Sequence, residues 1–150
     1  MSHSRPYAVY CDGSCIGNPG PAGWGAVIIA PDGKKSCVSG SLGGATNQIA
    51  ELAAAIHALA LIPEGSEVVL HSDSRYLVDG LSKWLDNWLR RQWRSTTGSE
   101  VANIALWKQL DGLRRRYSIR AVWVKGHDGH PENEEADGLA RTAALRNRAA

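Results

Sequence analysis

The pattern of hydrophobic and polar positions predicts that the chain opens with three strands. Residues 7–15 begin as an apolar run with aromatic and β-branched members, which is typical of a buried strand. A loop rich in glycine and proline follows, and residues 24–30 form a second apolar run. A Pro-Asp-Gly turn then leads into a weakly alternating edge strand at residues 35–42. Because strands joined by short loops are antiparallel neighbours, these strands predict a meander.

The rest of the chain predicts helices alternating with strands. Leu52, Ile56 and Leu59 recur at helical spacing and predict a helix over residues 46–61, with Thr46 as its N-cap. Residues 67–72 form a near-continuous apolar run, which suits a parallel strand covered on both faces. The remaining elements are three helical segments, a last strand and a final helix, at residues 74–81, 83–94, 101–115, 119–124 and from residue 131.

This order of elements predicts an α/β domain. We expect a five-stranded mixed sheet, made of the antiparallel meander and two parallel strands, with helices on both faces. The first strand should be central, between the second strand and the strand at residues 67–72. The chain of 150 residues has the length of one domain, so we expect residues 1–150 to form a single domain.

Composition adds few constraints. A net charge of +2 does not require a polyanionic partner, so any nucleic-acid binding must come from local clusters of basic residues. The three cysteines are an odd number, and the first residues lack the apolar core of a signal peptide, so we expect a cytoplasmic protein. Cys11 and Cys15 share a strand and are about 13 Å apart, too far for a disulfide. No apolar run reaches the ~20 residues of a membrane span.

Four acidic residues are candidates for one site. Asp12 lies on the predicted central strand, where an unpaired carboxylate would be costly, and Asp73 follows the neighbouring parallel strand. Ligands of open α/β sheets bind beyond the carboxyl ends of the strands, and helix packing can bring Glu51 and Asp137 to that end. Ligation by oxygen alone favours Mg²⁺ or Mn²⁺, and two such ions support phosphoryl transfer.

Each acid also has a simpler interpretation. Asp12 can cap a turn together with Gly13, and Asp73 can be the N-cap of the helix that follows it. Glu51 and Asp137 can be solvated helix residues, as most surface acids are. Spacing alone leaves these alternatives open.

Four segments, taken together, resemble a known family. They span nearly the whole chain and read Asp12-Gly13-Ser14-Cys15-x-Gly17-Asn18-Pro19-Gly20-Pro21, Thr46-Asn47-x-x-x-Glu51-Leu52-x-Ala54, Ser72-Asp73-Ser74-x-Tyr76 and Trp123-Val124-Lys125-Gly126-His127-x-Gly129-His130-Pro131-x-Asn133-Glu134-x-x-Asp137. In this order and spacing they closely resemble type 1 ribonuclease H, the enzyme that cuts the RNA strand of RNA–DNA hybrids. The resemblance implies the ribonuclease H-like fold, and it implies that Asp12, Glu51, Asp73 and Asp137 are the metal-binding catalytic carboxylates.

The resemblance also implies a mechanism. The carboxylates would hold Mg²⁺, or Mn²⁺, with two ions when substrate is bound. In-line attack of activated water on an RNA phosphodiester would leave a 5′-phosphate and a 3′-hydroxyl. His127 matches the family's mobile catalytic histidine and would transfer a proton or help the product leave. Taken alone, a single histidine is more simply a surface or core residue.

Two substrate-binding surfaces follow from the same resemblance. Selectivity would come from the RNA 2′-hydroxyl, read in the minor groove of the hybrid by Gly13, Ser14, Cys15, Asn18, Asn47 and Gln48. A basic protrusion would contact the DNA strand through Trp84, Trp88, Arg90 and Arg91, and a DNA-phosphate pocket would contain Thr46 and Asn87. Arg75, which stands where a glutamine is common, is a further candidate contact. The simpler interpretation of the tryptophans is core packing, with the arginines on a solvated face.

The sequence therefore predicts a metal-dependent endoribonuclease that acts on RNA–DNA hybrids. We expect a monomer with no obligate protein partner and no membrane association. One alternative is a non-catalytic hybrid-binding module, and the presence of all four carboxylates argues against it. Another is a transposase- or integrase-like strand-transfer domain, and the segment at residues 123–131 argues against it.

Overall fold

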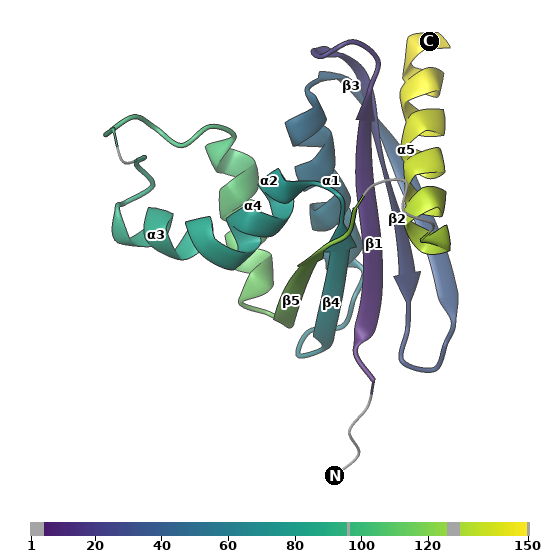
Figure 1. Cartoon of the computed structure of the whole chain (residues 1–150), viewed down its shortest axis with the longest axis horizontal. Coiled ribbons are helices and arrows are strands. Elements are labelled where there is room, and N and C mark those ends of the chain that lie inside the picture. Colours follow the sequence, from purple (N-terminus) through teal and green to yellow (C-terminus); the bar gives the residue numbers. More distant parts are fainter. Residues whose placement is uncertain (1–4, 96, 126–129, 150) are drawn as a thin grey trace.

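A five-stranded sheet in the order β3-β2-β1-β4-β5 forms the centre of the fold (Figure 1). The computed structural model describes residues 5–95, 97–125 and 130–149. The strands are β1 (Tyr7–Cys15), β2 (Gly20–Ile29), β3 (Lys35–Ala45), β4 (Glu67–Ser72) and β5 (Ser118–Trp123). The pairs β1–β2 and β2–β3 are antiparallel, whereas β1–β4 and β4–β5 are parallel. The predicted mixed sheet, with its first strand in the middle and its third at an edge, is confirmed.

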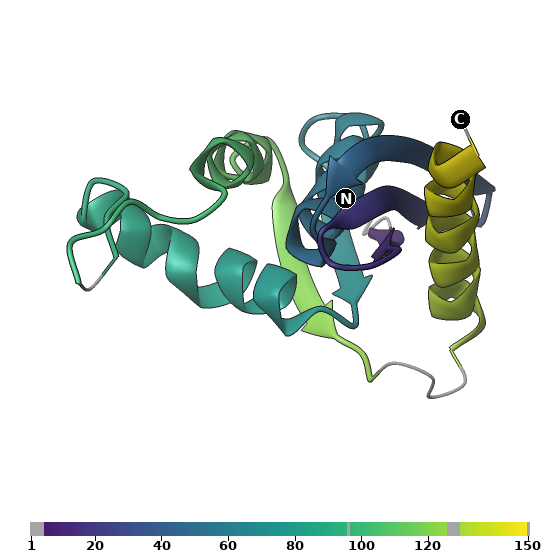
Figure 2. The same ribbon diagram turned by 90° about the horizontal axis from the view of Figure 1, so that it is seen from above.

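Helices cover both faces of this sheet, as predicted (Figure 2). On one face lies α1 (Asn47–Ala60), with α4 (Ile104–Arg114) beside it, and on the other lies α5 (Pro131–Ala149), packed against β1, β2 and β3. Between β4 and α4, the chain forms α2 (Arg75–Asp79), the π-helical turn η1 (Gly80–Trp84) and α3 (Leu85–Arg90) without interruption. This run projects away from the sheet, to the left in Figures 1 and 2.

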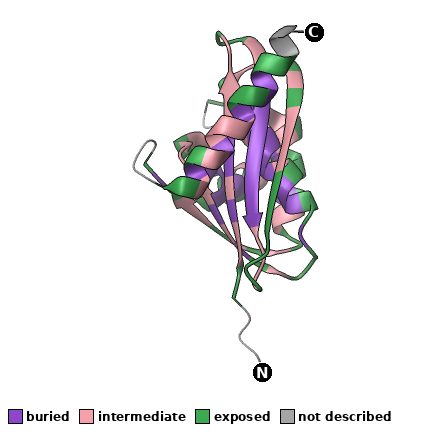
Figure 3. Cartoon of the chain, turned by 90° about the vertical axis from the view of Figure 1, so that its right-hand side faces the viewer, coloured by how far each residue is buried: buried purple, intermediate pink, exposed green. Residues whose placement is uncertain are grey.

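The main core fills the space between the sheet, α1 and α4. Its fully buried side chains include Trp107, Leu52, Leu59, Leu70 and Leu110. Burying each of these leucines contributes about 1.5–3 kcal/mol to folding. On the opposite face the buried residues of α5 are mainly alanines, and Figure 3 shows the buried strands behind that helix.

Two glycines let α1 and α5 approach the sheet closely. A Cβ at Gly13 would lie 2.5 Å from the backbone nitrogen of Glu51 in α1. A Cβ at Gly25, which pairs with Asp12, would lie 2.6 Å from the carbonyl oxygen of Ala136 in α5. No side chain fits at either position, so the backbones of both helices lie directly on the sheet beside Asp12.

The predicted helix at residues 83–94 is wrong at its end. It stops at Arg90, because Gln92 and Trp93 adopt left-handed φ angles of 54° and 64°. This turn brings the Trp93 ring back against the core. The predicted loop before residue 24 is also wrong in part, because β2 already begins at Gly20, which pairs with Ala45 at the end of β3.

The described helices and cysteines bear on the membrane and disulfide predictions. None of the helices formed by residues 5–95, 97–125 and 130–149 is long and apolar enough to cross a bilayer. Cys11 and Cys15 are both free, so the prediction that they form no disulfide is confirmed.

The η1 turn depends on Gly80, because a Cβ there would lie 1.9 Å from Cη2 of the fully buried Trp107. We expect Gly80→Ala to lower the free energy of unfolding by about 1–3 kcal/mol, since the ring or the helix must move. Gly112→Ala is the matched control: its Cβ would meet no atom within 4 Å, so it should stabilise α4 by about 0.5–1 kcal/mol. Urea unfolding measures both, and equal stabilities of the two variants would contradict this packing.

Candidate active site

The acidic site forms where the pairing between β1 and β4 ends. The two strands pair only as far as Tyr10 and His71, after which β1 continues beside β2 alone. Asp12 lies two residues beyond the last pair, and Asp73 directly follows β4. Both carboxylates therefore lie at the carboxyl ends of adjacent parallel strands, where ligands of α/β sheets bind.

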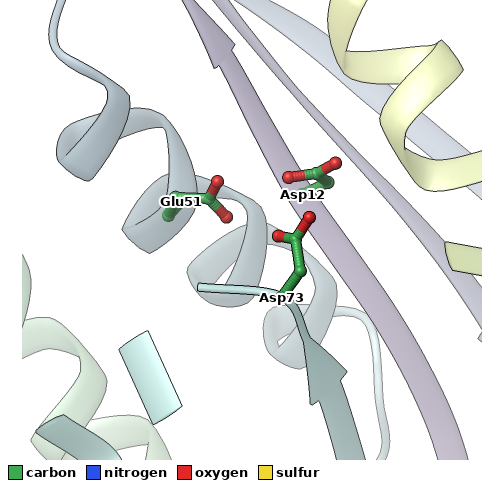
Figure 4. Close-up of side chains that lie close together, drawn as sticks. All are labelled: Asp12, Glu51 and Asp73. Carbon is green, nitrogen blue, oxygen red and sulfur yellow. The ribbon is translucent and has the colours of Figure 1, made fainter. Parts of the chain in front are cut away.

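Glu51 joins these two carboxylates from the second turn of α1. The close contact between α1 and Gly13 brings its side chain over the end of β1. Carboxylate oxygens of Asp12, Glu51 and Asp73 all lie within 4.8 Å of one another, and Figure 4 shows the three groups pointing toward a common centre. Three distant parts of the chain thus form one acidic cluster.

The simpler interpretations of these three acids do not hold. Asp12 lies within β1 rather than in a turn, and its Oδ1 accepts a 2.8 Å hydrogen bond from the backbone nitrogen of Gly13. The N-cap of α2 is Ser74, not Asp73. Glu51 is only partly exposed, and its Oε2 is buried.

Asp137 lies at the rim of the same site. Its side chain and the three clustered acids line one open pocket of about 350 Å³, but Asp137 is not part of the tight cluster. One of its oxygens pairs with the Arg141 guanidinium at 2.9 Å, one turn further along α5. All four predicted carboxylates therefore converge on one pocket, with three close together and the fourth at its edge.

Burial and the charges of neighbouring acids raise the pKa values of Asp12 and Glu51. Removal from water is the largest cause of the rise in the pKa of Asp12 to about 8, and the charge of Asp73 adds to it. Burial, followed by the charges of Asp12 and Asp73, also raises the pKa of Glu51 well above its ordinary value. Without a cation, the cluster therefore binds protons at neutral pH.

The cluster fits a divalent cation. While the neighbouring acids are ionised, the buried Glu51 Oε2 has no hydrogen-bond donor among residues 5–95, 97–125 and 130–149. Leaving a buried acceptor unpaired costs about 1–3 kcal/mol, and a cation would remove that cost. Two ligands on opposite sides of one Mg²⁺ lie about 4.2 Å apart, so oxygens within 4.8 Å need little movement to share an ion.

Several predicted minor-groove residues lie beside the acids. Gly13, Asn47 and Gln48 line the acidic pocket. Asn18 is next to them, because its Oδ1 accepts a 3.1 Å hydrogen bond from the backbone nitrogen of Asn47. The same end of the sheet carries Ser14, which is half-buried, Cys15, whose thiol donates to the carbonyl of Ala45 at 3.2 Å, and Thr46, which is the N-cap of α1 as predicted.

The predicted protrusion residues gather on η1 and α3. Trp84, Asn87, Trp88 and Arg91 line a cavity of about 190 Å³, which we call the tryptophan cavity. Arg90 lies beside it and donates a hydrogen bond to Asn87. The Trp88 ring also packs on the core, 5.2 Å from the ring of Trp107, which agrees with the simpler interpretation of core packing, while contact of Trp88 with DNA stays a prediction.

Two further residues, which were not among the predicted site residues, also lie at these sites. Ser74 lines the acidic pocket. Its position directly after Asp73, between a predicted strand and a predicted helix, could have indicated this. Arg94 lines the tryptophan cavity and belongs to the same basic run as Arg91. Arg75 does not line the acidic pocket but stacks on Trp123. His127 lies outside the described residues.

The fold and site define a class of protein: an α/β domain that carries an acidic cluster suited to divalent cations at the carboxyl ends of its central strands. The sequence model of the RNase H family matches residues 4–145. The chain therefore belongs to the ribonuclease H family, and its resemblance to type 1 ribonuclease H is confirmed.

The chain matches curated relatives over most of their length. The chain is 46% identical to the ribonuclease H of Thiobacillus denitrificans over 140 residues, covering 93% of this chain and 94% of that protein. It is 48% identical over 132 residues to the ribonuclease HI of Caulobacter vibrioides, covering 88% of each. Among solved structures, LC9-RNase H1, a type 1 RNase H with the type 2 active-site motif, is 33% identical with a TM-score of 0.85, covering 98% of this chain and 76% of that one.

The raised pKa values predict how stability depends on pH in the absence of divalent cations. The folded-state pKa of Asp12, about 8, exceeds its ordinary value of 3.8, so the native state binds more protons than the unfolded state between these two values. Protonation of Asp12 therefore contributes to the free energy of unfolding fully below about pH 3.8, and this contribution is lost as the pH rises toward about 8.

We therefore expect stability in EDTA to fall more steeply with pH in the wild type than in Asp12→Asn, whose side chain does not titrate. Urea unfolding of both proteins at intervals between about pH 5 and pH 8 measures the difference. Identical pH profiles for the two proteins would show that Asp12 does not titrate in this range.

Proposed function

We propose that this chain is a divalent-metal-dependent endonuclease that hydrolyses the RNA strand of RNA–DNA hybrids. The observation that carries the proposal is the meeting of Asp12, Glu51 and Asp73 within 4.8 Å, with Asp137 on the same pocket, in a chain of the ribonuclease H family. The name of each curated relative given above agrees with this activity.

The four carboxylates would hold Mg²⁺, with Mn²⁺ as a substitute, and we expect two ions when the hybrid is bound. Bound divalent cations supply the activation of the attacking water and the stabilisation of the leaving oxygen. Glu51 offers a buried oxygen at the base of the site, and Asp12 and Asp73 lie beside it. Asp137 would have to exchange its contact with Arg141 for a cation. Because the ligands must lose protons, binding should weaken as the pH falls.

We assign recognition of the RNA strand to the residues around the acidic pocket. The side-chain amides of Asn47 and Gln48 each carry a donor and an acceptor, which suits contact with a 2′-hydroxyl. Gly13 lines the pocket between them and the acids. Ser14, Cys15 and Asn18 complete this proposed groove from the end of β1 and the loop after it.

We assign binding of the DNA strand to the tryptophan cavity and its surroundings. The half-buried rings of Trp84 and Trp88 offer rigid aromatic surfaces, and Arg90 and Arg91 are exposed beside them. A DNA phosphate would be held by Thr46 and Asn87. Our assignment of a proton-transferring role to His127 rests on the sequence, where a near-neutral imidazole suits that task.

We also propose that residues 1–150 act as a single domain, as a monomer in the cytoplasm, without an obligate protein partner or membrane association. One chain supplies every acid and both proposed binding surfaces. A module that only binds hybrids would gain nothing from gathering four carboxylates, since their charge repels phosphates. This favours catalysis over the alternative of a non-catalytic hybrid-binding module.

The proposed activity is tested by comparing substrates. Purified protein is incubated with RNA–DNA, RNA–RNA and DNA–DNA duplexes of one sequence, labelled on either strand, with Mg²⁺ or with EDTA. We expect cleavage of the RNA strand of the hybrid in Mg²⁺ alone. Cleavage of all three duplexes, or cleavage that persists in EDTA, would contradict the proposal.

Asp12→Asn should reduce cleavage to an undetectable rate while hybrid binding persists, because it removes an anionic ligand and leaves the groove residues in place. The control is Asp32→Asn in the exposed hairpin, where the asparagine can still accept the hydrogen bond from Lys34. Cleavage assays and binding measured in EDTA separate the two effects. Full activity of Asp12→Asn would refute the metal-site assignment.

Arg90→Ala combined with Arg91→Ala should weaken hybrid binding and flatten its dependence on salt. Each lost phosphate contact lowers the slope of log affinity against log salt by about 0.9. Arg115→Ala combined with Arg116→Ala removes the same charge at the far end of α4. If the two double variants show the same slope, the DNA-binding surface lies elsewhere.

A further inference from the structure

Trp123 contacts the backbone of one of the clustered acids. It ends β5 and pairs in register with Ser72, the residue before Asp73. Its indole Nε1 donates a 3.1 Å hydrogen bond to the backbone carbonyl of Asp73. Despite its size, the side chain remains 40% exposed. One edge of the ring therefore contacts the backbone of a clustered acid, while another part of its surface is open to solvent.

The segment that carries Asp73 is held by bonds on both sides. The backbone nitrogen of Val124 donates to the carbonyl of Ser72 at 2.9 Å. The backbone nitrogen of Ser74 donates to the Ser72 hydroxyl at 3.0 Å, and the Ser74 hydroxyl caps α2. The indole of Trp123 donates its hydrogen bond to Asp73, which lies between Ser72 and Ser74. Together these bonds fix the backbone from which the Asp73 side chain projects.

Arg75 uses the face of the same ring. Its guanidinium carbon lies 4.1 Å from the ring centroid of Trp123, which is the geometry of a cation–π contact. Arg75 is exposed and begins α2, two residues after Asp73. The stack therefore holds a positive charge beside the segment that carries Asp73.

We propose that Trp123 is a positioning residue that acts on two groups at once: its N–H fixes the backbone of Asp73, and its face holds the Arg75 guanidinium ready for a backbone phosphate of the hybrid. The inference rests on the proposed function, because it takes the acidic pocket as the site of cleavage. It adds Trp123 to the site and gives Arg75 a defined ligand. A planar guanidinium that is already held in place loses little freedom when it binds a phosphate.

Two substitutions separate the two actions. Trp123→Phe keeps an aromatic face for Arg75 and removes the N–H, so we expect Mn²⁺ or Mg²⁺ binding, measured by calorimetry without substrate, to weaken about tenfold. Hybrid binding in EDTA should stay near that of the wild type. Arg75→Ala should show the reverse: unchanged metal binding, weaker hybrid binding, and a salt slope lower by about 0.9.

Arg116→Ala is the matched control for charge, since Arg116 is exposed and lies before the other end of β5. Wild-type metal affinity in Trp123→Phe would overturn the role of the N–H. A salt slope for Arg75→Ala equal to that of Arg116→Ala would overturn the phosphate contact. If the roles were purely structural, both variants would have a lower melting temperature. Trp123→Phe would then not lose metal binding alone, and Arg75→Ala would not lose hybrid binding alone. Failure of the proposed function is a separate result, seen when the wild type does not cleave the RNA strand of hybrids.

Discussion

The acidic site depends on the direct contact of two helix backbones with the central strands. At Gly13 the backbone of α1 lies against β1, and at Gly25 the backbone of α5 lies against β2 on the opposite face. These contacts place Glu51 and Asp137 at the point where Asp12 and Asp73 end the parallel strands. A Cβ at either glycine would lie less than 3 Å from the helix backbone, so the helix would have to shift and its acid would move relative to the others. Two positions without side chains thus set the geometry of four acids.

Gathering these acids costs stability that the rest of the fold supplies. Burial, followed by the charges of neighbouring acids, raises the pKa values of Asp12 and Glu51, and Glu51 carries a buried oxygen without a donor among the described residues. The compensating layer is the core between the sheet, α1 and α4, centred on Trp107, whose indole donates to the Tyr76 hydroxyl at 2.9 Å. Proteins commonly keep such locally unfavourable groups where a ligand relieves them.

Much of this arrangement follows from sequence patterns, and the exceptions have physical causes. Short loops predict the antiparallel meander, and the apolar run before Asp73 predicts a parallel neighbour for β1. Helical spacing does not reveal how deeply Glu51 is buried. Its burial depends on the close approach of α1 to β1, which is possible only because Gly13 has no side chain. The early end of α3 could not be predicted either, since tertiary packing of Trp93 overrides local helix propensity. The bond from Trp123 to Asp73 depends on the register of β4 and β5, which the apolar pattern leaves open.

The central claim is that carboxylates from remote parts of the chain bind divalent cations together. Anomalous diffraction from crystals soaked in Mn²⁺ tests it most directly, with Asp12→Asn crystals grown in the same way as the control. The account predicts a Mn²⁺ peak within bonding distance of oxygens from Asp12, Glu51 and Asp73, and a weak or absent peak in the variant. Ordered carboxylates with no peak between them, while Mn²⁺ occupies other sites in the same crystal, would contradict it.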